Sequence, residues 1–330
     1  MKVAYKTVFI LGFVMFLISC GSGSSDKSGD NEDKNSSNWP PATENEVPDS
    51  YGFVIDSPVA GLRYVSGKHY GVTDDEGRFG YIEDENVQFF IGDIRLGVSV
   101  MPSARVTPFE LAGSDASVAI NIARFLQTLD DDGEPSNGII VNDAVHSLAE
   151  GVELNFASAG WIEKKFFEYE YEVVDDRIVP IFSDEELAIQ QLLTKLNAAT
   201  SVDTVTLVSG YDAYTHFSTT LNAIIDSLET EANSVASRSL CSSDDQCEIV
   251  SLLSRDTYFC GSDGPALTYS TLDIELGVFD EIVNERGALI GVKTQLESEV
   301  DSGIDWTGSC LSYSRVPYAI CGEDSRCEVR

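Results

Sequence analysis

Basic residues are scarce in this chain, and histidine is scarcer still. The 330 residues include 21 lysines and arginines against 55 aspartates and glutamates, so the formal net charge at pH 7 is -34. A surface this acidic repels nucleic acid and anionic lipid headgroups, which excludes nucleic acid as a partner. The hydrophobic fraction of 43% is nevertheless sufficient to build cores, so the chain is not globally disordered.

Sequence motifs of catalysis are also absent. The three histidines, His69, His146 and His216, lie far apart, and no local pattern joins one of them to a nucleophile. There is no G-x-S-x-G, H-E-x-x-H or phosphate-binding glycine loop. Carboxylate pairs occur throughout so acidic a chain, so no single pair indicates glycosidase chemistry. We therefore expect a protein that is not an enzyme.

The first 20 residues combine a short basic start with an apolar run. Lys2 and Lys6 precede the run, and Thr7–Ile18 carries no charge. At about 1.5 Å per residue this run reaches roughly 18 Å as a helix, well short of the ~30 Å hydrocarbon core of a bilayer. Residues 1–19 are therefore predicted to be a signal peptide and not a membrane-spanning helix.

The end of this run, Leu17-Ile18-Ser19-Cys20, resembles the bacterial lipobox. In that motif a peptidase cuts before the cysteine, and the cysteine sulfur carries diacylglycerol. The resemblance implies that Cys20 is a lipid-attachment site that anchors the protein to the membrane through acyl chains such as palmitate. Because Gly21 and not aspartate follows the cysteine, it also implies an outer-membrane location, facing the periplasm or the cell exterior.

Residues 20–50 are predicted to form a lipidated cysteine and a flexible tether. The stretch from Gly21 to about Ser50 is rich in Gly, Ser, Asp, Asn, Lys and Pro and has hardly an aliphatic side chain. It cannot bury enough area to offset the entropy lost on ordering. A coil of 30 residues spans roughly 30 Å, which would hold the folded part clear of the lipid headgroups.

Residues 51–141 are predicted to form a small antiparallel β-sandwich followed by a helix. Short runs alternate with period two, as at Phe53 and Ile55 or at Val87, Phe89 and Ile91, and Gly- or Asp-rich breaks separate them. The clearest hairpin turn is expected at Asp74–Gly77, where glycine tolerates a positive φ.

The order of these motifs, DSPVAGLRY followed by GVTDDEGRFGY, resembles the transthyretin-like modules related to the regulatory domain of carboxypeptidases. The extension through VQFFIGDIRLG and NIARFLQTLDDDGEPSNGI resembles a segment of Gram-negative surface proteins and lipoproteins. These resemblances cover Gly52 to Ile140 and imply a scaffold or binding surface.

The helix predicted to begin at Ser114-Asp115 has one apolar stripe and ends in an acidic turn. The stripe contains Val118, Ile122, Phe125, Leu126 and Leu129. Asp130 and Asp132 alternate as calcium ligands would, and Asn137 adds a side-chain carbonyl. Pro135 and Val141 stand where an EF-hand needs Gly and Glu, so the turn is not an EF-hand. The two interpretations left are a solvated acidic turn, which is favoured, and a modest calcium site; no cofactor is otherwise expected.

Residues 142–240 are predicted to be mainly helical. Ser183–Glu186 is a capping box ahead of one apolar stripe, and a second stripe contains Phe217, Leu221 and Leu228. Glu163–Val174 alternates instead and is expected to form a strand.

Residues 241–330 form the predicted cysteine-rich α+β unit, because every remaining cysteine lies there. The six are Cys241, Cys247, Cys260, Cys310, Cys321 and Cys327. An even number in an exported segment predicts three disulfides, whereas zinc is disfavoured by the C-x5-C spacing and the lack of His. We expect bonds across the segment and not within each C-x5-C, although about 15 pairings are possible in principle.

The flanks of this unit carry two further expectations. A helix is predicted over Thr271–Val300, capped by Ser270, with Leu272, Leu276 and Phe279 facing a sheet. A protease-sensitive break is predicted at Glu229–Ser239, where small polar residues take over. The arrangement resembles uncharacterised cysteine-rich tails of bacterial lipoproteins.

Taken as a whole, the sequence favours an α+β protein made of a transthyretin-like sandwich, a central helical region and a disulfide-locked C-terminal unit. The predicted function is that of a non-enzymatic cell-envelope lipoprotein that binds an envelope protein or glycan. The alternative is a secreted-type enzyme or protease inhibitor whose site is assembled from dispersed residues.

Overall fold

The computed structural model divides the chain into two units, Met1–Asn35 and Ser36–Arg330. It describes residues 39–41, 44–161, 171–174, 177–180, 183–199, 205–252, 266–272, 276–300 and 318–330, all in the second unit. The predicted signal peptide, Cys20, Cys260 and Cys310 lie outside these residues. Among the helices of the described ranges, none is long and apolar enough to cross a membrane.

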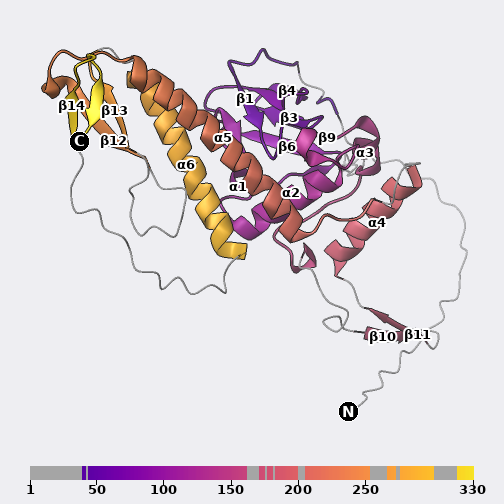
Figure 1. Cartoon of the computed structure of the whole chain (residues 1–330). Helices are drawn as coiled ribbons and strands as arrows, with labels where there is room; N and C mark the ends of the chain where they lie inside the picture. Colours follow the sequence, from indigo (N-terminus) through magenta and orange to yellow (C-terminus); the bar gives the residue numbers. More distant parts are fainter. Residues whose placement is uncertain are drawn as a thin grey trace, which may run out of the picture. The chain divides into compact units, whose positions relative to one another are not determined.

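The described part is a mixed α+β fold with small sheets and α-helices, as the sequence predicts (Figure 1). One sheet has the strand order β5-β1-β8 and a second has the order β4-β3-β6-β7. Their bounds are β1 Ser50–Val54, β3 Arg63–Ser66, β4 His69–Val72, β5 Arg78–Tyr81, β6 Val87–Ile91, β7 Ile94–Arg95 and β8 Arg105–Val106.

These two sheets share one hydrophobic core. Alternate residues point inward, so Val54 of β1, Phe79 of β5 and Phe89 of β6 are almost fully buried. The rings of Phe79 and Phe89 meet edge to face, with 5.0 Å between their centroids. The period-two pattern is therefore confirmed at Val87, Phe89 and Ile91, but it is wrong for β1, where Val54 is buried and Phe53 and Ile55 are only half-buried. The likeness to transthyretin-like modules stays a prediction.

The turn at Asp74–Gly77 forms, but the prediction that it closes a hairpin is wrong. Gly77 has a φ of +76°, and the Asp74 side chain accepts hydrogen bonds from the backbone of Glu76 and Arg78. However, β4 pairs with β3 and β5 pairs with β1, so this turn carries the chain from one sheet to the other. The hairpin turns are instead at Gly67 and Gly92.

The module is not purely antiparallel, although the sequence predicts it to be. β1 pairs parallel with β8, and β2 (Val59–Ala60) pairs parallel with β9 (Ile139–Ile140). Both pairings join segments about 50 or more residues apart in sequence, which the period-two pattern cannot reveal because it is the same in both orientations.

Four helices follow or flank the sheets: α1 Pro108–Leu111, α2 Ala116–Thr128, α3 Asp143–Leu148 and α4 Asp184–Ala199. Asp115 caps α2, and the predicted capping box of α4 is present, with Ser183 and Glu186 bonded reciprocally. Ile122, Phe125 and Leu126 of α2 are buried against the sheets, which confirms the predicted stripe.

Between α3 and α4 the structure describes one short hairpin. β10 (Tyr171–Val174) pairs antiparallel with β11 (Arg177–Pro180). The end of the strand predicted at Glu163–Val174 is thus confirmed, and its first part lies outside the described residues.

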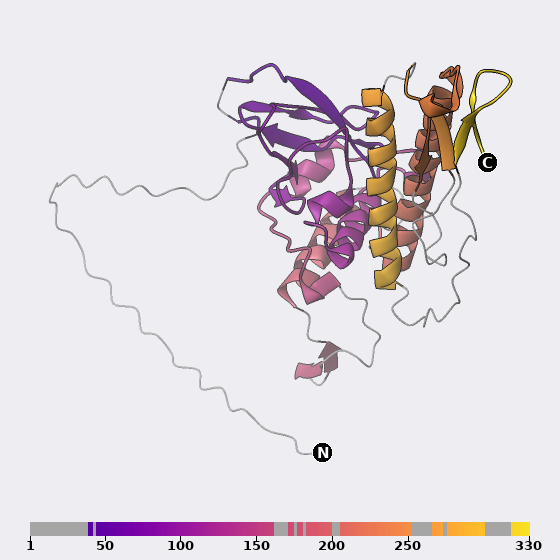
Figure 2. The same cartoon turned by 90° about the vertical axis from the view of Figure 1, so that its left-hand side faces the viewer.

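A second core joins α5 (Gly210–Arg238) to α6 (Leu276–Val300), which lie side by side in Figures 1 and 2. Phe217, Leu221 and Leu228 of α5 are buried there, which confirms the second predicted stripe. The prediction that the apolar stripe ends at 229–239 is wrong, whereas protease cleavage there stays a prediction. α5 runs through Arg238, and the small residues Ala232 and Ala236 are buried.

The start of α6 also differs from the prediction. Ser270 is the buried last residue of β13 (Ala266–Ser270) and not a helix cap, and α6 begins at Leu276. Leu272 and Leu276 are 69% and 40% exposed, whereas Phe279 is buried as expected. The predicted stripe extends past the helix because Leu272, which lies in a turn, shares its spacing by coincidence.

Two disulfides fasten the C-terminal hairpin. Cys241 pairs with Cys321 and Cys247 with Cys327, each across 80 residues, so the bonds cross the segment as predicted. The first ties the stretch before β12 (Cys247–Ser251) to β14 (Ala319–Cys321), and the second ties the start of β12 to β15 (Cys327–Val329). The third predicted disulfide involves Cys260 and Cys310 and stays a prediction.

Candidate functional site

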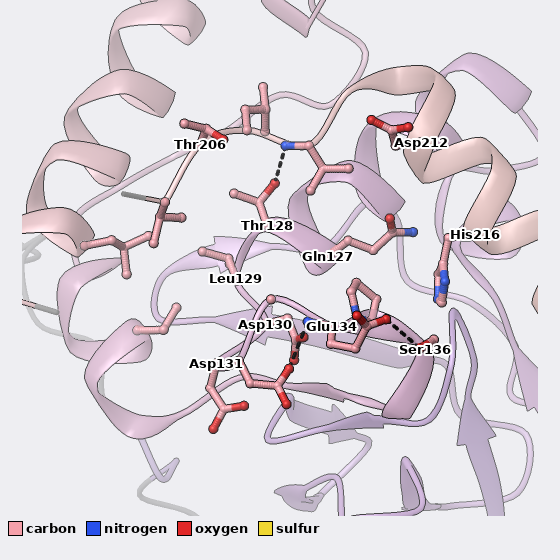
Figure 3. A pocket seen from close by; sticks show the side chains of 18 of the residues that line it. Gln127, Thr128, Leu129, Asp130, Asp131, Glu134, Ser136, Thr206, Asp212 and His216 are labelled. Atoms are coloured by element: carbon pink, nitrogen blue, oxygen red, sulfur yellow. Dashed lines mark hydrogen bonds between the residues drawn. The ribbon is translucent and has the colours of Figure 1, made fainter. Parts of the chain in front are cut away.

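A cavity of about 770 Å³ opens beside the C-terminal end of α2 (Figure 3). Residues 127–136, the start of α3, Leu196 of α4, residues 205–209 and the start of α5 line it. Its volume falls in the range of small-molecule sites in proteins. One wall is apolar and includes Leu129, Val145, Leu196, Val205 and Leu207.

The rest of the wall is strongly acidic. Five carboxylates line the cavity: Asp130, Asp131, Asp132, Glu134 and Asp212. No lysine or arginine occurs among the lining residues that the structure describes. In Figure 3, Asp130 and Asp131 gather on one side, and Asp212 projects from α5 across the opening. The cavity therefore favours positively charged groups.

The acidic loop holds its shape through its own carboxylates. Asp132 accepts from the Glu134 amide and from the Asn137 side-chain nitrogen, both at 2.9 Å. Asp130 Oδ1 accepts from the Ile140 amide at 2.9 Å, while its Oδ2 is buried and has no hydrogen-bond partner among the described residues. Burial raises the pKa of Asp130, and the Asn137 hydrogen bond lowers the pKa of Asp132.

The three predicted calcium ligands, Asp130, Asp132 and Asn137, come together in this loop. Asp130, Asp131 and Asp132 can each offer an oxygen within 4.8 Å of the others. Asn137 lies beside them, since its Nδ2 donates to Asp132 at 2.9 Å, and its side-chain carbonyl oxygen is the atom predicted to ligate calcium. Asp131, an exposed acid between the predicted ligands, adds a further carboxylate, and calcium binding stays a prediction.

Adding millimolar Ca²⁺ is expected to raise the thermal midpoint of the wild-type chain if this loop binds calcium. A ligand that binds only the folded state stabilises it, by about 1.4 kcal/mol at roughly ten times its dissociation constant. Asp131→Asn should remove most of the increment without breaking a loop hydrogen bond. Scanning calorimetry measures both.

Ionic strength must be matched with NaCl in that titration, because screening alone stabilises a chain of charge -34. Glu231→Gln on α5 serves as the control variant and should keep the wild-type increment. Equal midpoints in Ca²⁺ and in matched NaCl would leave only the interpretation as a solvated turn.

All three histidines donate a ring N–H to a backbone carbonyl. The acceptor is Glu46 O for His69, Gly61 O for His146 and Asp56 O for His216, at 2.7, 2.7 and 2.8 Å. His146 also accepts from the Gly92 amide at 2.9 Å. Burial lowers the pKa of His146 and of His216, so both rings are held in their neutral form.

One histidine lies next to a serine in an unusual conformation. Ser57 has a φ of +89° and is 5% exposed, and its Oγ lies 3.1 Å from Nε2 of His216. Such strain is frequent at active sites. Here, however, the same Nε2 is 2.8 Å from Asp56 O, and a carbonyl can only accept a hydrogen bond. Nε2 therefore carries the proton and cannot take one from Ser57.

Behind His216 lies a fully buried carboxyl group, that of Asp56. Gln127 donates to its Oδ2 at 3.0 Å, and its Oδ1 has no hydrogen-bond partner among the described residues. Burial raises the pKa of Asp56 well above its usual value. Asp56, Gln127 and His216 are far apart in sequence, so no local pattern could have brought them together in a prediction.

Asp56→Asn is expected to stabilise the protein at pH 7, because burial raises the pKa of Asp56 in the folded chain and disfavours its ionisation there. Below the unfolded-state pKa the folded and unfolded chains both carry the proton, so Asp56 has no effect there. Above it the unfolded chain ionises while the folded one holds its proton, and stability falls as pH rises. The gain of Asp56→Asn should therefore shrink from about pH 7 to about pH 4.

Urea unfolding at several pH values measures this gain, with the exposed Asp75→Asn as the control. Asp75→Asn should show no comparable pH-dependent gain. An Asp56→Asn chain that is less stable than wild type at pH 7 would contradict this prediction. It would mean that the carboxylate is ionised and that its oxygens have hydrogen-bond partners.

Comparison of the chain with protein-family models, with curated proteins and with solved structures finds no match.

Proposed function

We propose that this chain is a lipid-anchored cell-envelope protein whose folded part binds a positively charged group of an envelope protein or glycan. The acidic cavity is the observation that supports the binding part of the proposal. Its five carboxylates and its apolar wall suit a cation attached to a less polar body. The lipobox-like Leu17–Cys20 carries the anchoring part.

The two disulfides support export. Disulfides persist in oxidising compartments and are rare in the cytosol. Cys241–Cys321 and Cys247–Cys327 close long loops in a unit that also lacks a zinc-like spacing, so the described cysteines are structural.

The arrangement of the histidines supports a binding role over catalysis. The contact between Ser57 and His216 is the observation that would favour the alternative of an enzyme. Because Nε2 of His216 donates to Asp56 O, the imidazole acts as a tie between α5 and the turn that follows β1.

Cys20→Ser is expected to leave the precursor unprocessed by the lipoprotein peptidase and unlabelled by fatty acid. The thiol is the acceptor of the lipid, and serine does not replace it. Labelling of cells with palmitate, followed by purification of the chain, measures this. Palmitate incorporation into Cys20→Ser would end the anchoring proposal.

The binding part is tested by pull-down of envelope fractions on the chain from Gly21 onward. This form retains the whole unit Ser36–Arg330. Capture should fall when Asp131 and Asp212 are both changed to asparagine and should persist when Glu231 and Glu285, which lie outside the cavity, are changed to glutamine. Equal capture by both variants would contradict binding at the cavity.

A further inference from the structure

Residues 44–47, here named the edge strap, lie along β4, an outer strand of the four-stranded sheet. They belong to the stretch that the sequence predicts to be flexible tether, and that prediction is wrong for these residues. The strand order places β4 at the edge of its sheet, with β3 on its inner side. Edge strands expose unpaired backbone groups and readily pair with other chains.

Asn45 covers the centre of this edge as a neighbouring strand would. Its Oδ1 accepts from the Tyr70 amide at 3.0 Å, and its Nδ2 donates to Tyr70 O at 2.9 Å. This is the donor and acceptor pair that an opposing residue offers in an antiparallel ladder. One side chain thus satisfies both outward-facing backbone groups of Tyr70.

Contacts on either side hold the strap in place. The Glu46 amide donates to Lys68 O at 3.4 Å, and Glu46 O accepts from Nδ1 of His69 at 2.7 Å. Earlier in the chain, Trp39 packs edge to face on Tyr70, with 5.9 Å between the ring centroids. The Cζ atom of Arg63 lies 5.5 Å from the centroid of the Trp39 ring. These separate contacts take the place of a continuous ladder, since β1, which follows the strap, begins at Ser50 and pairs in the other sheet.

The strap is attached weakly enough to be displaced. Asn45, Glu46 and Val47 are all exposed, Val47 by 84%. The ion pair of Glu46 with Lys68 is solvent-exposed, and such pairs contribute about 1 kcal/mol or less.

We propose that the edge strap prevents β4 from pairing with β4 of a second copy of this chain. The segment from Gly67 to Val72 carries no acidic residue, so like-charge repulsion is weaker here than elsewhere on so acidic a surface. Antiparallel self-pairing centred on Tyr70 sets Lys68 opposite Val72, and no like charges face each other. Val72 is 51% exposed and supplies apolar contact.

The test compares the wild-type chain from Gly21 onward with Trp39→Ala/Asn45→Ala by sedimentation velocity and hydrogen exchange. The wild type should stay monomeric over a wide range of concentration. The double variant should become dimeric as concentration rises. Its Tyr70 amide should exchange faster than in the wild type in dilute solution and slower in the dimer.

Adding Val72→Lys to the double variant supplies the control, because it sets charges against each other across the new interface. This triple variant should return to the monomer. Three results would each overturn the proposal: a dimeric wild type, a double variant that stays monomeric or keeps the wild-type exchange rate at Tyr70, or a triple variant that still dimerises.

Discussion

Removing both described disulfides is expected to lower the free energy of unfolding by about 7 kcal/mol, while removing either one alone lowers it by only about 3 kcal/mol. The two bridges are parallel, since Cys241–Cys321 and Cys247–Cys327 each span 80 residues. With one bridge in place, the other closes only a small ring, made of residues 241–247 and 321–327. Closing that ring stabilises the folded chain by roughly 3 kcal/mol, whereas closing the long loop stabilises it by about 4 to 5 kcal/mol.

The variants are Cys241→Ala/Cys321→Ala, Cys247→Ala/Cys327→Ala and the combination of all four, each unfolded in urea. Non-reducing peptide mapping of the wild type is the accompanying control. Two single removals that each lower the free energy of unfolding by the full long-loop amount would contradict the parallel arrangement. A linked peptide joining Cys241 to Cys247 would contradict the pairing itself.

Glu229→Gln is expected to lower the free energy of unfolding by about 3 kcal/mol, because it leaves the Arg286 guanidinium buried without its counter-charge. The Arg286 side chain on α6 is 1% exposed and lies 2.6 Å from Glu229 of α5. Nε of Arg286 also donates to the same carboxylate at 2.8 Å. Denaturant unfolding measures the loss.

The matched control is Glu297→Gln, which breaks the pair with Lys293 within the same helix. Pairs at i, i+4 on a helix surface contribute only about 0.5 kcal/mol. The double variant Glu229→Gln/Arg286→Met should recover most of the loss, because no buried charge remains. A loss in Glu229→Gln no larger than that in Glu297→Gln would show that α5 and α6 do not depend on the buried pair.

The elements that the sequence predicts well are those whose cause is local. The capping box at Ser183, the Asp115 cap and the stripes of α2 and α5 follow from spacing alone, and the structure has them. Long-range disulfides could also be expected, because the entropy of loop closure favours wide spans over short ones.

The features that the sequence does not reveal depend on partners distant in the chain. The parallel partner of β1, the burial of Asp56 and the role of His216 all arise where segments separated by about 50 or more residues meet. The edge strap escapes prediction for a related reason. Its residues are polar and bury little, so their composition resembles that of a tether, but their side chains bond to the backbone of β4.

The tie between His216 and the turn after β1 has a consequence for the order in which this chain folds. The turn at Asp56 emerges early in synthesis, and the imidazole that holds it follows 160 residues later. Contacts this distant carry a large loop-closure entropy and form slowly. The turn after β1 therefore reaches its final, tied form only after α5 has been made, so this part of the fold is completed on the whole chain and not on its first half.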